Sequence, residues 1–129
     1  MTEPAVTEPA STVLGDAEAM LERGSWLSAS NRAYYAMFYA ARQYLQTRYP
    51  EETRNVKKHS GVITKFSELA VMRDGLASEL GADLATVAQN RVSFDYTAER
   101  VPTEEDARRM VETARRFVPT VLVALETPQ

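Results

Sequence analysis

The sequence predicts an all-α fold, an antiparallel bundle of four to five helices. Apolar residues recur at spacings of three and four along most of the chain, as they do on the buried faces of helices. No stretch alternates apolar and polar residues as a strand does. Glycine and proline stand where the periodic stretches end. The 129 residues, 44% of them hydrophobic, suit one domain with a substantial core.

The first eleven residues are predicted to form a disordered tail, and the helical domain is predicted over residues 12–126. The tail contains the unit Thr-Glu-Pro-Ala twice and is too rich in proline and glutamate to pack as a helix. The first helix is expected from about Thr12 to Arg23, with Gly24 as its C-terminal stop.

The second helix is expected from about Trp26 to Arg48, with Ser25 as its N-cap and Pro50 preventing its continuation. Its apolar residues cover more than one face. They are Trp26, Leu27, Ala33, Tyr34, Met37, Phe38, Ala41, Tyr44 and Leu45. A helix with one solvent-facing side needs only a single apolar stripe. We therefore predict a central helix, packed against its own chain on one side and against a partner on another.

A polar loop is expected over residues 51–58, and a third helix is expected to start near His59 or Ser60. Gly75 and Gly81 are interpreted as breaks that follow it. The fourth helix is predicted from a stripe at alternating spacings of four and three. The stripe consists of Leu80, Leu84, Val87, Arg91 and Phe94.

The last helix is expected to begin at Thr103, directly after Pro102. Thr103 is a suitable N-cap, and the three acidic residues that follow it suit the positive end of the helix dipole. Pro119 falls inside this helix and is expected to kink it. The apolar face is Ala107, Met110, Val111, Ala114, Phe117, Val118, Val121, Leu122 and Leu125.

Composition excludes several classes of function. Without cysteine there is no disulfide, thiolate zinc site or cysteine nucleophile. The single histidine excludes a multi-histidine metal site within one chain, and the sequence has neither a carboxylate cluster with metal-ligand spacing nor a phosphate-binding glycine loop. We therefore expect no metal and no cofactor. A net charge of −3 argues against a protein that coats nucleic acid over its whole surface. No apolar run is long enough for a membrane span and no secretion signal is present, so a cytoplasmic protein without membrane contact is expected.

Two polar groups interrupt the apolar helices. Asn31, Arg32 and Tyr35 lie on the second helix, where they either tie helices together or support a groove. Arg91 lies inside the apolar stripe of the fourth helix, four residues before Asp95. An arginine in such a stripe must be paired or must open onto a groove, where its planar fork of donors suits a phosphate. A purely structural Arg91–Asp95 link is the alternative.

A basic segment without acidic residues surrounds the single histidine. It contains Arg54, Lys57, Lys58, His59 and Lys65. Such a segment can bind a phosphate backbone or an acidic partner, or it can form an ordinary solvated loop. The histidine suits a general acid or base because histidine titrates near neutral pH, but it can also simply cap its helix.

Four segments resemble signatures of HEPN domain proteins. They are ASNRAYYAMF at residues 29–38, KHSGVI at residues 58–63 followed by Phe66, NRVSFDY at residues 90–96, and the closing helix at residues 104–118. The resemblance covers roughly residues 12–125 and is closest to the small stand-alone branch labelled UPF0332. It implies an HEPN-like helical bundle that dimerises, in a toxin–antitoxin or defence type of module often encoded beside a nucleotidyltransferase.

The resemblance also implies a chemistry, from which this chain departs at one position. Many HEPN proteins are metal-independent endoribonucleases whose motif at the dimer groove is an arginine followed, after four to six residues, by a histidine. Arg91 matches the arginine, but the positions for the histidine hold Tyr96, Thr97 and Ala98. The usual catalytic base is therefore missing.

Three hypotheses follow. The leading one is a homodimeric RNA-binding or toxin-like protein with a nucleotidyltransferase as a candidate partner, in which Arg91 flanks a dimer groove. Asn31, Arg32, Tyr35, Asp95 and Tyr96 are the expected supports of this groove, and Arg54, Lys57, Lys58 and Lys65 are the expected further RNA contacts. The second is an active endoribonuclease that uses Arg91 and His59. The third is a non-catalytic dimeric adaptor or antitoxin-like subunit that binds its partner through the tyrosine-rich central helix.

Overall fold

The structure is a computed structural model that describes the backbone of residues 9–96 and 101–126 and the side chains of residues 9–92 and 101–126. Within these ranges the chain forms helices and no strand, which confirms the predicted all-α class. Residues 1–8, most of the predicted tail, lie outside the described residues. The first helix, α1 (Ala10–Glu22), already begins before the predicted start at Thr12.

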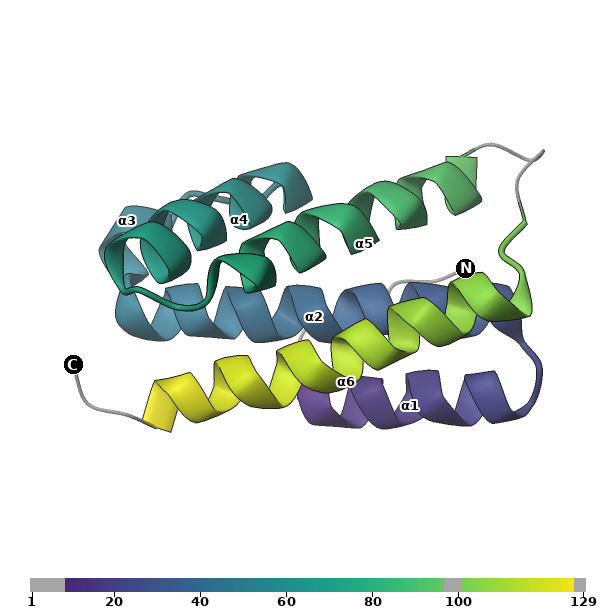
Figure 1. Ribbon diagram of the computed structural model, residues 1–129. Helices are drawn as coiled ribbons and strands as arrows, with labels where there is room; N and C mark the ends of the chain where they lie inside the picture. The colour runs from purple at the N-terminus through teal and green to yellow at the C-terminus, as the bar shows by residue number, and fades with distance from the viewer. Residues whose placement is uncertain (1–8, 97–100, 127–129) are drawn as a thin grey trace.

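Helices α1 and α2 (Trp26–Arg48) run antiparallel and are joined by a tight turn (Figure 1). Gly24 has a φ of 77°, a backbone conformation that residues with a side chain rarely adopt, and it ends α1 as predicted. Ser25 occupies the N-cap position of α2, but its side chain makes no capping hydrogen bond. The predicted side-chain cap is therefore wrong. The ψ angle of Ser25, 79°, departs from the extended backbone that an N-cap residue usually has.

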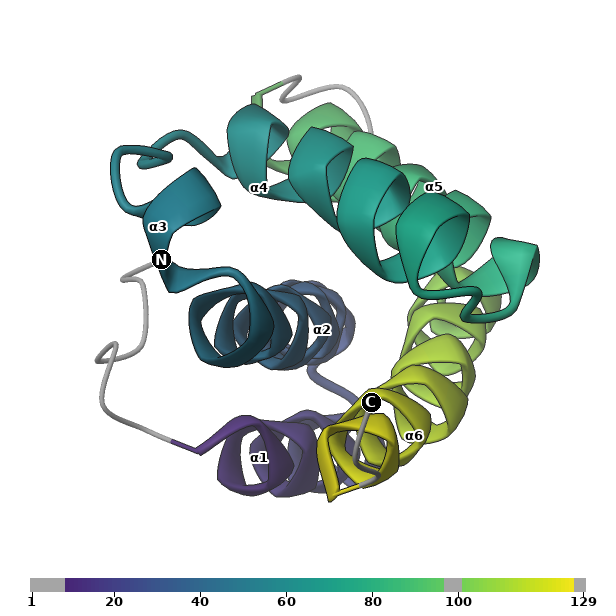
Figure 2. The same cartoon turned by 90° about the vertical axis from the view of Figure 1, so that its left-hand side faces the viewer.

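Helix α2 is the centre of the bundle. It packs against every other element, and the end-on view shows α1 below it, the last helix of the chain beside it and the intervening helices above it (Figure 2). Tyr34, Tyr35, Tyr39 and Tyr44 are each no more than 4% exposed. The predicted partner face made of these tyrosines is therefore wrong, because the chain itself covers more than one side of α2.

The chain between α2 and the last two helices is more helical than predicted. Where a polar loop was expected, α3 (Pro50–Thr53) forms a short helix with Pro50 in its first turn, a position for which proline is preorganised. Helix α4 (His59–Lys65) begins where predicted and passes directly into the π-helix η1 (Phe66–Arg73). The wider turns of η1 end at Arg73, and Gly75, where φ is 83°, then breaks the chain direction as predicted.

Helix α5 (Ser78–Tyr96) carries the predicted stripe, of which Leu80, Leu84 and Val87 are buried. Gly81 lies inside this helix, so its interpretation as a break is wrong. Gly81 instead faces η1, where a Cβ atom would lie 3.4 Å from Val71 Cγ2. The missing side chain therefore lets α5 and η1 pack closely.

Helix α6 (Glu104–Glu126) returns along the bundle and packs against α1 and α2. The amide of Asp106 donates to Thr103 Oγ1 over 3.1 Å, and the amide of Thr103 donates to Asp106 Oδ2 over 3.0 Å. This reciprocal pair confirms the predicted N-cap. Pro119 lies inside α6 and does not end it. Proline has no amide hydrogen for the carbonyl four residues earlier, but Pro119 is on the exposed face, where water can bind that carbonyl instead.

Candidate functional site

A pocket of about 390 Å³ opens between α4 and α5 and reaches Tyr34 of α2. Its lining consists of Tyr34, His59, Ser60, Ile63, Thr64, Ala85, Ala88, Gln89, Arg91 and Val92. Close packing at Gly81 brings α5 against η1, whereas the α5 residues that face α4 include the small Ala85 and Ala88. Small side chains at this level leave the space that forms the pocket.

Arg91 is partly exposed and is held in the pocket wall by α2. Its Nη2 atom donates a hydrogen bond to Tyr35 Oη over 3.0 Å. Its Cζ atom lies 5.4 Å from the ring centres of both Tyr34 and Tyr35, within reach of a cation–π interaction. The sequence required Arg91 either to be paired or to open onto a groove, and the structure provides both.

His59, the first residue of α4, is also positioned by α2. Its Nδ1 atom lies 2.8 Å from Tyr34 Oη. Its ring centre lies 4.2 Å from that of Phe38, with 30° between the ring planes. Because the Tyr34 hydroxyl can donate or accept, the direction of this hydrogen bond decides which ring nitrogen carries the proton in neutral His59.

Arg91 and His59 therefore line the same pocket although they lie far apart in the sequence. Tyr34 contacts both, through a hydrogen bond to the imidazole and through its ring face to the guanidinium. Sequence reasoning placed Tyr34 and Phe38 in the apolar core and missed their contact with His59. Their spacing of four puts both on one helix face, but the sequence does not say which element covers that face.

The other residues predicted on α2 differ in their surroundings. Tyr35 contacts Arg91, as a support of the groove should. Asn31 is 3% exposed, and its Oδ1 atom has no hydrogen-bond partner among the described residues. Arg32 is half-exposed and makes no polar contact with the described part of the chain. The side chains of Asp95 and Tyr96 lie outside the described residues, so the Arg91–Asp95 pair stays a prediction.

The basic segment is partly neutralised by acidic residues that flank it. Arg54 forms an ion pair with Glu51 at 3.2 Å, and Lys65 forms one with Glu68 at 3.3 Å. Both pairs are exposed and contribute little to stability. Lys57 and Lys58 are exposed, and Lys58 directly precedes the pocket residue His59.

Neither a metal cluster nor a membrane-crossing helix occurs in the described part of the chain. No group of three or more histidine, aspartate and glutamate side chains within these ranges is arranged to hold a metal ion. No helix there combines the length and the apolar character that a membrane crossing requires.

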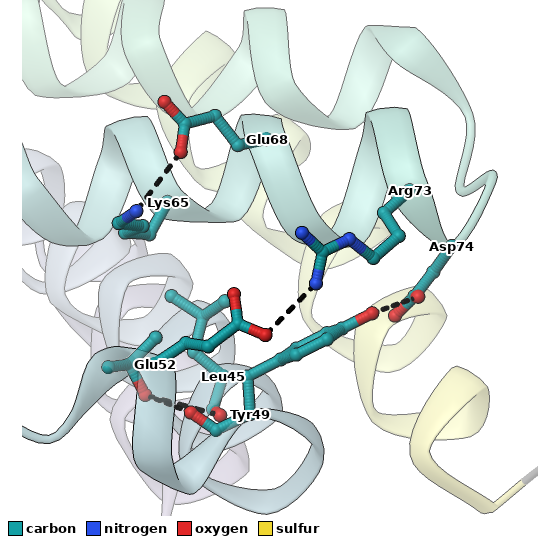
Figure 3. Close-up of polar contacts among 8 residues, drawn as sticks. Leu45, Tyr49, Glu52, Lys65, Glu68, Arg73 and Asp74 are labelled. Atoms are coloured by element: carbon teal, nitrogen blue, oxygen red, sulfur yellow. Dashed lines mark hydrogen bonds and ion pairs between the residues drawn. The ribbon is translucent and has the colours of Figure 1, made fainter.

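A second polar cluster fixes the end of η1 to the end of α2 (Figure 3). The Asp74 carboxylate accepts hydrogen bonds from Tyr44, over 2.5 Å, and from Tyr49. Arg73 forms a 3.0 Å ion pair with Glu52 and lies over the Tyr49 ring. Burial and the hydrogen bond to Asp74 raise the pKa of Tyr44 well above its ordinary value of 10.0.

Replacing Tyr44 with phenylalanine is expected to reduce the loss of stability in alkali. The unfolded chain loses the Tyr44 proton near pH 10, whereas the folded protein keeps it to higher pH, so the contribution of Tyr44 is present below pH 10 and declines above it. Above pH 10 the variant's unfolding free energy should fall less steeply, by up to about 1.4 kcal/mol per pH unit. Urea denaturation at several pH values measures this, and equal slopes would contradict the role given to Tyr44.

The fold and the pocket together define a class of protein: a small helical bundle whose central helix holds an arginine and a histidine at one pocket. The sequence profile of the HEPN domain matches residues 5–124. The chain therefore belongs to the HEPN domain family, as its signatures predicted.

Two relatives agree with this assignment. A Methanocaldococcus jannaschii protein named "Putative toxin MJ0605" is 35% identical over 123 residues, which cover 95% of this chain and 87% of the relative. A UPF0332 protein of Thermotoga maritima is 28% identical over 113 residues, which cover 88% of this chain and 83% of the relative. The second name agrees with the predicted branch.

Proposed function

We propose that this HEPN protein is a toxin-type RNA-binding protein whose Arg91 binds an RNA phosphate at the pocket between α4 and α5. The observation that carries the proposal is the position of the guanidinium, held by Tyr35 at the wall of a pocket that also contains His59. Family membership and the relative named as a toxin support it.

The chemistry of Arg91 suits this role. A guanidinium has five N–H donors in one plane, so it can donate to Tyr35 and to phosphate oxygens at the same time. The two tyrosine rings of α2 limit its motion, so little side-chain entropy remains to be lost when the phosphate binds. The exposed Lys57 and Lys58 precede the pocket in the chain and add positive charge for the neighbouring phosphates.

The proposal includes a homodimer and a protein partner. Two copies of the chain would bring two Arg91 side chains to one RNA groove, as the family resemblance implies. A nucleotidyltransferase is the proposed partner, because the HEPN resemblance implies a module often encoded beside one. Sedimentation of the purified chain tests the dimer, and co-expression with the product of a neighbouring gene tests the partner.

A second function, cleavage of RNA, is favoured by the proximity of His59 to Arg91. When Nδ1–H donates to Tyr34, the Nε2 atom of His59 holds the lone pair of a base. His59 then accepts the proton of a ribose 2′-hydroxyl, and the 2′-oxygen attacks the adjacent phosphorus. The bond between this phosphorus and the 5′-oxygen of the next nucleotide then breaks. The leaving 5′-oxygen takes a proton from His59 or water and becomes a 5′-hydroxyl, and the other fragment ends in a 2′,3′-cyclic phosphate. Arg91 stabilises the charge on the phosphorane.

Replacing Arg91 with alanine tests the binding proposal. Loss of a charge-assisted hydrogen bond to phosphate should weaken binding of single-stranded RNA by about 10- to 100-fold at low salt. The slope of log affinity against log salt should decrease by about 0.7 for each phosphate that the variant no longer neutralises. Fluorescence polarisation with a short labelled RNA measures both.

The matched control is Arg116→Ala, which removes the same charge from the exposed surface of α6. It should leave both the affinity and the slope close to those of the unchanged protein. Equal effects of the two substitutions would show that Arg91 contributes only to the overall charge, and they would overturn the proposal.

A further inference from the structure

The pocket beside Arg91 is larger than one phosphate group requires. Its volume of about 390 Å³ lies within the range of pockets that hold small organic ligands. Helices α4 and α5 run antiparallel (Figure 1), so His59 at the start of α4 lies at the same end as Arg91, near the end of α5. Ile63 lies one helical turn further along α4, with Ala85 and Ala88 earlier along α5. The pocket therefore continues away from the phosphate-binding end.

The chemistry of this second end differs from that of the first. Ile63, Ala85 and Ala88 give it apolar walls, which a phosphate cannot use. The side chains of Thr64 and Gln89 add a hydroxyl and a carboxamide at its exposed rim. Apolar walls with a few hydrogen-bonding groups suit a flat, uncharged ligand whose polar atoms lie on its edge.

We infer that this end of the pocket binds an unstacked nucleobase of single-stranded RNA, next to the phosphate that binds Arg91. The inference rests on the proposed function, since it assigns the base of the same RNA. The base lies between the apolar residues of α4 and α5 and presents its edge to Gln89 and Thr64. The carboxamide of Gln89 both donates and accepts, so it distinguishes bases by the arrangement of their edge groups.

This arrangement predicts which nucleic acids bind. Bases in an RNA duplex are stacked and paired and cannot enter a pocket, whereas bases of a single strand can be unstacked. An abasic strand keeps the phosphates for Arg91 but has no base for the apolar end. The protein should therefore bind a base-containing single strand about tenfold more tightly than an abasic strand of equal length. One bound base contributes a binding free energy of this order in other single-strand-binding proteins.

The experiment fills the apolar end with Ala88→Leu and uses Ala82→Leu, at an exposed position of the same helix outside the pocket lining, as the matched control. Labelled RNA and an abasic strand of equal length are the two probes. Ala88→Leu should reduce binding of RNA to the level of the abasic strand and leave abasic binding unchanged. Ala82→Leu should keep the tenfold difference. Circular dichroism and the melting temperature establish that both variants fold.

A second variant, Gln89→Ala, changes an exposed side chain and so does not depend on repacking. It should reduce the differences in affinity among the four RNA homopolymers. The inference is overturned if the unchanged protein binds the abasic strand as tightly as RNA, or if Ala88→Leu and Gln89→Ala both leave RNA binding unchanged.

The failures of the two proposals can be distinguished. If Arg91→Ala weakens binding of both probes while Ala88→Leu changes neither, phosphate binding stands and the base site is wrong. If Arg91→Ala changes neither probe, the proposed function fails and the base site fails with it.

Discussion

Replacing Phe38 with alanine is expected to lower the free energy of unfolding by about 3–5 kcal/mol and to weaken RNA binding as well. Phe38 is 1% exposed, and its ring contacts Tyr34, Tyr35 and His59. Removal of the ring leaves a cavity in the core next to the pocket. Tyr34 and Tyr35 lose a ring against which they pack, so they should hold Arg91 less firmly, which weakens RNA binding. His59 also loses the surface on which its imidazole lies. Urea denaturation and fluorescence polarisation measure the two effects.

The control is Phe117→Ala in α6. Phe117 is fully buried and packs against Phe66 at 5.5 Å, and it does not line the pocket. Its loss should destabilise the protein by a similar amount but leave RNA affinity unchanged at a temperature where both variants are folded. Phe38→Leu, which keeps most of the volume, provides a milder variant if Phe38→Ala does not fold. Equal RNA affinity of the Phe38 and Phe117 variants would show that Phe38 does not position the site.

Replacing His59 with alanine is expected to slow RNA cleavage by about 10²- to 10⁴-fold if the protein is a ribonuclease. Its ring lines the pocket with Arg91, and this chain has no other histidine. A metal chelator should leave the cleavage by the unchanged protein unaffected. Gel analysis of labelled RNA measures the rate and shows whether the product carries a cyclic phosphate.

The control for this variant is His59→Asn, whose carboxamide can keep the hydrogen bond to Tyr34 but cannot act as a base near neutral pH. It should retain RNA binding and lose cleavage. If His59→Ala cleaves as fast as the unchanged protein, cleavage does not depend on this histidine. If the unchanged protein does not cleave RNA at all, the binding proposal remains and the nuclease proposal fails.

The sequence predicted the bounds of α2 well because this helix has its own start and stop signals, whereas the start of α5 was obscured by Gly81, which lies inside that helix. Helix α2 lies between Gly24 and Pro50, and its observed bounds are those expected. The π-helix was not predicted, because Phe66, Leu69 and Ala70 follow the same spacing of three and four that an α-helix has. The helical turn at Pro50 was also missed, since a four-residue helix is too short to show a period.

The candidate site was predictable only in part. Arg91 stood out because a charged residue interrupted an apolar stripe, and its place at a pocket follows from that conflict. The contact between Tyr34 and His59 joins two helices, and no spacing along one helix reveals it. The same limit explains the wrong partner face of α2: apolar periodicity shows how many faces are covered, but not whether the same chain covers them.

Nuclear magnetic resonance of the protein during titration with a short single-stranded RNA shows whether RNA binds at the pocket that Arg91 and His59 line. Because His59 is the single histidine, its imidazole signals need no assignment by mutation. If RNA binds at this pocket, the His59 ring signals and the Arg91 side-chain N–H signal shift together and saturate at the same RNA concentration. Shifts confined to exposed residues such as Lys57, with the His59 and Arg91 signals unchanged, would contradict it.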